Sequence, residues 1–263
     1  MDTAAAAPPA VWSRRRRRAA ELRDRYPFAA EVLTLYLALL DVQQEAAGAA
    51  GTAAPAEPVS WAAANVVPRV VAASVEAGPT LLAEGAAARL HGGGVEEVLT
   101  AWLVGGELEP VDRYLARATM APLLEALPGV RALCAAQPAG CPACGGPPQL
   151  SWLGASGESL VAARRSLLCA RCQGSWTVPR AACPGCGELV TVHAERSATE
   201  PEPPVFPHLR IEGCEHCHRY VIGVDLGKDV QAMPEVDELA AIPLALYASE
   251  QGLTKLTPNL MGM

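Results

Sequence analysis

The chain has 263 residues, of which 51% are hydrophobic and 5% aromatic, so it can bury an apolar core and is not a disordered protein. The dominance of Ala, Leu and Val favours close helix packing over an aromatic-rich β-sandwich. The longest apolar stretch, Phe28 to Leu40, has thirteen residues and includes Glu31. A membrane span needs about 18 or more such residues, so we expect a soluble protein with no membrane insertion.

The net charge of −7 is unevenly distributed along the chain. Residues 1–27 carry seven Arg and three acidic residues, residues 28–137 carry five Arg and twelve acidic residues, and residues 138–263 carry nine basic and thirteen acidic residues. Such an acidic body argues against a polyphosphate partner, and we expect no binding of nucleic acid.

The basic N-terminal segment contains a run from Arg14 to Arg18. An arginine-containing export signal would be followed by an uncharged apolar stretch, whereas Glu21, Arg23 and Asp24 follow here. We therefore expect no export and interpret the run as a solvated basic arm that leads into a helix.

The segment before the cysteines has helical periodicity. Residues 13–47 form one or two helices that break near Pro27, because apolar residues recur there at spacings of three and four. A Gly/Ala/Pro linker is expected at residues 48–58. Helices should follow at about residues 59–77, 79–90, 94–104 and 110–127, and a last helix should span Val236 to Glu250.

Nine cysteines lie in the second half of the chain, and eight of them form four C-x-x-C pairs within 77 residues. The pairs are Cys141/Cys144, Cys169/Cys172, Cys183/Cys186 and Cys214/Cys217. This spacing is typical of tetrahedral thiolate ligation, in which two pairs complete the shell of one metal ion. The ninth, Cys134, is interpreted as a small buried thiol, with a reactive or redox role as the alternative.

The pairs alternate in type along the chain. The first and third contain Pro after the first cysteine and are followed by Gly145 and Gly187, which suit a left-handed turn, while the second and fourth lack both features. This alternation indicates an internal duplication with a period of about 42 to 45 residues. We predict a first site (Cys141, Cys144, Cys169, Cys172) and a second site (Cys183, Cys186, Cys214, Cys217). Crossed pairings remain an alternative, because Cys172 and Cys183 are close in sequence.

Around the cysteines the sequence predicts short strands, as in rubredoxin-like or zinc-ribbon modules. We expect these at residues 149–153, 166–169, 175–178, 189–193, 209–211 and 220–224. The metal should form most of the core of each module, with Trp152 and Trp176 covering the first site. Residues 197–207 are expected to form a polar loop or lid within the second module. His216 and His218 could each replace a cysteine ligand, but a turn or surface role is preferred.

The fold class is therefore α+β. It divides into a flexible leader (1–12), a helical domain (13–137), two tandem rubredoxin-like modules (138–182 and 183–233) and a C-terminal helix with its tail (234–263).

Several of these motifs together resemble the formate dehydrogenase accessory protein FdhE family. The segments that carry the resemblance are Cys141 to Pro148, Leu168 to Gly187, Arg210 to Tyr220, Val236 to Leu244 and Leu256 to Asn259, with a weaker likeness at 18–22 and 26–28. The resemblance implies a cytoplasmic maturation factor that binds the catalytic subunit of formate dehydrogenase before export. Because four thiolates leave no open position on a metal ion, we also expect that the protein is not an enzyme. The resemblance also implies rubredoxin-type iron, two ions in all, on the eight paired cysteines, with zinc as a substitute.

Two other functions remain as alternatives. A nucleic-acid-binding zinc ribbon would need basic and aromatic residues around the cysteines, whereas residues 138–263 are acidic. Only the Arg14 to Arg18 run favours this function. A dithiol oxidoreductase would need a C-x-x-C pair free of metal. We identify no catalytic residues, and self-association is not decided by the sequence.

Overall fold

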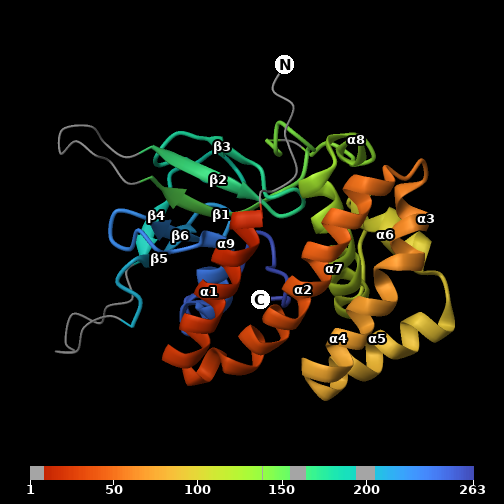
Figure 1. Ribbon diagram of the computed structural model, residues 1–263. Helices are drawn as coiled ribbons and strands as arrows, with labels where there is room; N and C mark the ends of the chain where they lie inside the picture. The colour runs from red at the N-terminus through yellow and green to blue at the C-terminus, as the bar shows by residue number, and fades with distance from the viewer. Residues whose placement is uncertain (1–8, 138, 155–163, 194–204) are drawn as a thin grey trace.

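The computed structural model of the chain describes residues 9–137, 139–154, 164–193 and 205–263. Figure 1 shows a helical part beside a mixed sheet, with helix α9 (Pro234–Ala240) returning to lie against helix α1 (Pro9–Arg25). The predicted α+β fold, in which helices precede a cysteine-containing sheet, is confirmed. The loop expected at 197–207 lies mostly outside the described residues, which resume at Val205.

The first two helices are long and antiparallel neighbours. Helix α1 (Pro9–Arg25) and helix α2 (Ala30–Ala53) are joined by a short 3-10 turn, η1 (Pro27–Ala29), so the break predicted near Pro27 occurs. Helix α2 continues through residues 48–53, which were expected to be a linker. Ala50 is fully buried, so packing keeps this Gly-containing segment helical until Ala54 adopts a left-handed conformation with φ of 42°.

Six shorter helices complete the N-terminal half of the described chain. They are α3 (Pro58–Asn65), α4 (Val67–Ala77), α5 (Thr80–Gly92), α6 (Val95–Val104), α7 (Pro110–Ala126) and α8 (Pro128–Arg131). Proline lies in the first turn of α3, α4, α7 and α8, where a missing N–H costs no helical hydrogen bond. Helices α5, α6 and α7 match the expected ranges closely. The stretch expected at 59–77 divides at Val66, just before Pro68.

The expected last helix is also divided in two. Helix α9 (Pro234–Ala240) ends before Ala241, and helix α10 (Ile242–Glu250) follows. Pro243 explains the break, because its ring would clash with the carbonyl four residues earlier in a continuous helix. A short strand, β7 (Thr254–Lys255), comes after α10.

The strands of the two modules join in one sheet. In the described residues they are β1 (Pro148–Leu153), β2 (Arg165–Cys169), β3 (Ser175–Thr177), β4 (Thr191–His193), β5 (Leu209–Cys214) and β6 (Arg219–Asp225). Their order is β3-β2-β1-β6-β5-β4, with β7 added beside β6. Neighbours within a module are antiparallel, whereas β1 and β6 are parallel and connect the modules through the pair Ser151 and Gly223.

Two apolar cores lie on different faces of helix α2. The first fills the helical part and includes Leu35 and Leu39, and the second packs Leu33 and Leu40 of the same helix against strands β5 and β6 and helices α9 and α10. The expectation that the metal forms most of the core of each module is wrong for the second module, because its sheet shares an apolar core with the helices. Trp176 packs with the first core as expected, but Trp152 packs against the second.

The N-terminal arginine run is part of the folded structure. Trp12, Arg15 and Arg18 are buried on one face of α1, because residues three apart lie side by side on a helix. The helix begins at Pro9, inside the segment expected to be a flexible leader. The prediction of a solvated arm is therefore wrong for Arg15 and Arg18, although Arg14 and Arg17 are exposed.

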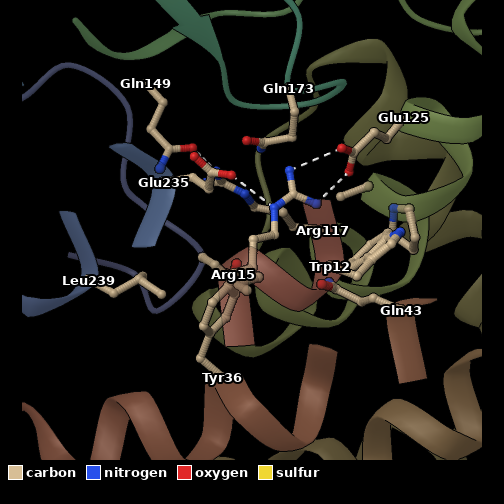
Figure 2. Close-up of a pocket in the computed structure, with 13 residues that line it drawn as sticks. Trp12, Arg15, Tyr36, Gln43, Arg117, Glu125, Gln149, Gln173, Glu235 and Leu239 are labelled. Atoms are coloured by element: carbon tan, nitrogen blue, oxygen red, sulfur yellow. Dashed lines mark hydrogen bonds and ion pairs between the residues drawn. The ribbon is translucent and has the colours of Figure 1, made fainter. Parts of the chain in front are cut away.

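Carboxylates explain why these two arginines are buried. Figure 2 shows Arg15 between Glu125 and Glu235, to which it forms ion pairs of 2.9 and 2.8 Å beside a cavity of about 50 Å³. Arg18 pairs with Asp237 and Asp229 at 2.5 and 2.6 Å. These ion pairs attach α1 to α7 and to the acidic segment around α9.

Candidate metal centres

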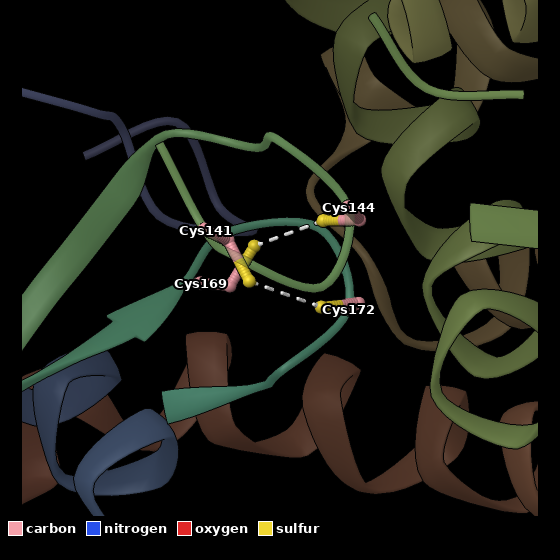
Figure 3. Close-up of side chains that lie close together, drawn as sticks. All are labelled: Cys141, Cys144, Cys169 and Cys172. Carbon is pink, nitrogen blue, oxygen red and sulfur yellow. Dashed lines mark hydrogen bonds between the residues drawn. The ribbon is translucent and has the colours of Figure 1, made fainter. Parts of the chain in front are cut away.

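The first site lies where the sheet meets the helical part. Cys141 and Cys144 lie on the loop before β1, Cys169 ends β2, and Cys172 lies on the turn toward β3. Figure 3 shows the four side chains converging, with sulfur separations of 3.7 Å for Cys141 and Cys172 and 3.5 Å for Cys144 and Cys169.

The second site repeats this arrangement. Its sulfur separations are 3.7 Å for Cys183 and Cys217 and 3.5 Å for Cys186 and Cys214. In both sites the first cysteine of one pair faces the second cysteine of the other. The thiols are grouped in sequential order, and neither crossed alternative occurs.

The sulfur positions fit a single cation at each site. All four sulfurs of a site lie within 4.8 Å of one another. A regular tetrahedron with metal–sulfur bonds of about 2.3 Å has edges of about 3.8 Å, close to the shorter separations. Each site could therefore bind one metal ion through four thiolates.

Hydrogen bonds shape the C-x-x-C turns in the same way in both sites. The amide of Gly145 donates to the carbonyl of Cys141 at 2.7 Å, and Gly187 donates to Cys183 at 2.9 Å. Both glycines have positive φ, 68° and 85°, as the sequence predicted. In addition, amides point at sulfur: Ala143 donates to Cys141 Sγ and Gly185 to Cys183 Sγ, at 3.4 and 3.3 Å.

The second and fourth pairs form the same turn without glycine. Gln173 and His218 follow the last cysteine of each pair, and they have φ of 58° and 53°. His218 thus has the turn role that was preferred for it. Neither His216 nor His218 belongs to a group of converging donors in the part of the chain that the structure describes.

The two sites differ in access to solvent. In the first site all four cysteines are buried, with exposures of 0–6%, and they belong to the core of the helical part. In the second site Cys186 is exposed and Cys217 is half-buried. Identical thiol shells therefore have different surroundings.

A buried cation accompanies the first site. The Arg171 side chain is 3% exposed, its amide donates to Cys169 Sγ at 3.3 Å, and its guanidinium donates to the carbonyl of Ala135 at 3.0 Å. Two thiolate pairs around a divalent ion carry a net charge of about −2, which a buried guanidinium offsets. The corresponding residues of the second site, Glu215 and His216, are exposed.

The thiols of the first site lie so close together that their pKa values shift in opposite directions. Hydrogen bonds with Cys134 and Cys141 lower the pKa of the Cys144 thiol, and those with Cys141 and Cys144 raise the pKa of Cys169. Neighbouring sulfurs must share protons because adjacent thiolates repel one another. A cation at the centre would let all four ionise. The half-buried Cys134 adjoins this site but is outside the group of four.

A third group of potential ligands has another occupant. His208, Asp229 and Asp237 converge in the described structure, but Asp237 accepts hydrogen bonds from Arg18 and from His208 Nε2 at 2.7 Å. The guanidinium of Arg18 occupies the position that a cation would take.

Buried polar residues that sequence reasoning missed hold the modules together. Glu212 of β5 pairs with Arg165 of β2 at 2.6 Å and accepts from Ser151 of β1 at 2.7 Å. Burial opposes the ionisation of Glu212, but the charges of Arg165 and Arg210 outweigh it and lower the pKa of the carboxyl. An acidic residue amid strand residues is the signal that could have indicated a buried partner.

Comparison with known protein families gives a match in the C-terminal part of the chain. Residues 181–261 match the family model described as FdhE, C-terminal domain. The resemblance to the FdhE family is confirmed. The chain is 31% identical to an FdhE homologue of Aquifex aeolicus over 46% of its own length and 41% of the relative, and 31% identical to one of Pseudomonas putida over 52% and 43%.

The fold is also that of a solved FdhE structure. The crystal structure of the FdhE protein from Pseudomonas aeruginosa matches with a TM-score of 0.65 at 20% identity, covering 95% of this chain and 94% of that one. In sequence, the chain matches about two fifths of the length of the curated FdhE homologues. Among the described residues, no helix has the length and apolar character needed to cross a membrane.

Proposed function

We propose that this chain is a non-enzymatic, metal-binding accessory factor that acts in the cytoplasm in the maturation of a formate dehydrogenase. It binds the catalytic subunit of that enzyme before export. The eight paired cysteines hold two metal ions, and iron of the rubredoxin type is the physiological metal, with zinc able to take its place.

The two converging thiol groups within an FdhE fold are the observation that carries this proposal. Four sulfurs at tetrahedral separations are a donor set that both Fe and Zn accept. The likeness to proteins named FdhE supports a role with formate dehydrogenase.

The donor set also limits the chemistry. Four thiolates fill a tetrahedral shell and leave no position for a water or substrate, which argues against Lewis-acid catalysis. Bound iron would supply one-electron redox chemistry, whereas zinc would supply only a scaffold. The residues of the chain bind the ion, bury it and, at the first site, balance its charge through Arg171.

The ion pairs of the arginine run argue against the alternative of nucleic-acid binding. It depended on the Arg14 to Arg18 run, in which Arg15, Arg16 and Arg18 form ion pairs with carboxylates of the same chain. Those guanidinium groups are already neutralised.

Metal analysis of the full chain, purified without oxygen, tests the ligand assignment. We expect two ions per chain and the visible absorption of iron–thiolate centres. A colourless protein with two zinc ions would contradict the iron assignment. A folded protein with about eight titratable thiols and no metal would contradict metal binding and favour the dithiol oxidoreductase.

Copurification with catalytic subunits of formate dehydrogenases tests the partner. We expect the wild type to capture a subunit and C141S and C183S to capture less, because each substitution unfolds one module. C134S, which changes the unpaired cysteine, is the matched control and should bind normally. Equal capture by all variants would place the interface on the helical part alone, and no capture by the wild type would contradict the proposed partner.

A further inference from the structure

The C-terminal tail, residues 253–263, runs from the second site to the helical part. Strand β7 pairs with β6 immediately after the fourth cysteine pair, in the register Arg219 with Thr254. The amide of Thr254 donates to the carbonyl of His218, and that of Leu256 donates to Tyr220, both at 2.9 Å. The start of the tail is therefore attached to the turn that contains Cys214 and Cys217.

Leu256 attaches the tail to the other cysteine pair of the same site. A Cβ atom added at Gly185 would lie 2.9 Å from Leu256 Cδ1 and 3.7 Å from Cys183 Sγ. The leucine side chain thus covers the turn between Cys183 and Cys186. Both halves of the second site contact the tail.

The other end of the tail is held in the helical part. Arg117 of α7, which is buried, donates to the carbonyl of Pro258 at 2.7 Å. Beyond it, Asn259 closes a turn by accepting from the amides of Met261 and Met263 at 3.0 and 3.1 Å. Leu260 and Met261 pack against both apolar cores.

A network of buried polar groups links the two ends of the tail. Lys255 pairs with Glu238 of α9 at 2.5 Å. Glu238 accepts a hydrogen bond from Gln149 of β1, and Gln149 in turn accepts one from Arg117. Movement of the strand β7 would therefore disturb the contacts that hold Pro258.

The tail also forms one wall of an apolar groove of about 350 Å³. The opposite walls come from α2, α5 and α7, with Leu35, Leu82 and Tyr114 among the lining residues, and the tail contributes Leu260 and Met261. The position of the tail thus decides how wide this groove is.

We propose that the tail couples the second site to this groove. The inference rests on the proposed function in one respect, namely that the second site binds a metal. With the ion bound, the two cysteine pairs hold Leu256 and β7, and the tail closes the groove wall. When the more exposed second site loses its ion, the pairs separate, the tail detaches, and the groove opens. The buried first site keeps its ion in both states.

Hydrogen exchange of the full chain, combined with metal analysis, tests this coupling. We expect a mild chelator to remove one ion from the wild type, and C186S to retain one ion that resists the chelator. In both cases the amides of residues 254–263 should exchange at least about tenfold faster, while those of β2 stay protected. Retention of tail protection after loss of one ion would overturn the proposal, as would equal loss from both sites.

A second variant isolates the contact from the metal. L256A should keep both ions and still show faster exchange across the tail, because it removes the side chain that covers Gly185. L133A is the matched control, since Leu133 is exposed and lies on the segment after α8, away from the tail, and its tail should exchange as in the wild type. A wild-type chain that binds no metal would instead contradict the proposed function, so the two failures are distinguishable.

Discussion

At the scale of single residues, the buried pair of Glu212 and Arg165 links the two modules in addition to the pairing of β1 with β6. Both side chains are almost inaccessible, at 2% exposure each for the whole residue, and Glu212 reaches from β5 across β6 to the strands of the first module. The path crosses Gly223, where an added Cβ would lie 2.6 Å from Glu212 Oε1. The absence of a side chain at Gly223 thus allows the ion pair to form.

Replacing Glu212 should be strongly destabilising. We expect E212Q to lower the free energy of unfolding at pH 7 by about 3 kcal/mol, because it leaves the guanidinium of Arg165 buried without its charge partner. Denaturant titration measures the difference. R210Q, on the half-buried second partner, should cost less, and equal effects of the two variants would contradict the assignment.

The same carboxyl gives a pH dependence with a defined sign. Its pKa is lowered in the folded state relative to the ordinary value of 4.5. Its contribution to stability is therefore complete above about pH 4.5 and is lost as the pH falls below that value. The stability gap between wild type and E212Q should shrink on acidification, which denaturant titrations at pH 7, 5 and 4 measure. A constant gap would show that the carboxylate charge contributes nothing.

The two glycines that follow the first and third cysteine pairs form a matched test. Both have positive φ, but a Cβ at Gly145 would lie 2.4 Å from Ala136 Cα, whereas nothing lies within 4 Å at Gly187. We expect G187A to cost about 1 kcal/mol from backbone strain alone. G145A should cost more than about 3 kcal/mol, since backbone atoms must move as well. Similar losses in thermal unfolding would argue against this packing.

At the scale of elements, helix α1 is held by charge as well as by apolar contacts. We expect R18Q to lower the free energy of unfolding by about 3 kcal/mol, because Asp237 would remain buried without its cation. R17Q, on the exposed face of the same helix, should change it by less than about 0.5 kcal/mol. Denaturant unfolding measures the free-energy change of each variant. A small effect of R18Q would contradict the role of its ion pairs and support the prediction of a solvated arm.

The sequence predicted most elements, and the exceptions have physical causes. Short-range signals such as the proline at 27, the glycines after the helices and the C-x-x-C spacing act within a few residues, so they located the first helix break, the strands and the grouping of the thiols. Contacts between residues far apart in the chain could not be predicted from the sequence. Nothing local distinguishes buried Arg15 from exposed Arg14, because the distinction comes from Glu125 and Glu235, far away in sequence.

At the scale of the whole molecule, the first site and the helical part should be lost together. Its four cysteines belong to the helical core, so we expect release of the first ion to coincide with the loss of helical circular dichroism during denaturation. The second ion should leave at lower denaturant concentration, because Cys186 is exposed. Release of both ions at one denaturant concentration would contradict this order.

The modules are joined head to tail. Strand β1 of one copy lies parallel to β6, the third strand of the other, and corresponding strands run in the same direction across the sheet. A twofold axis between the two modules would have given equivalent strands of both modules the same neighbours. A translation gives the two modules different neighbours, so their equivalent groups of four cysteines lie in different surroundings. A group of four cysteines placed against the helical part would become shielded from solvent without any change to its own residues.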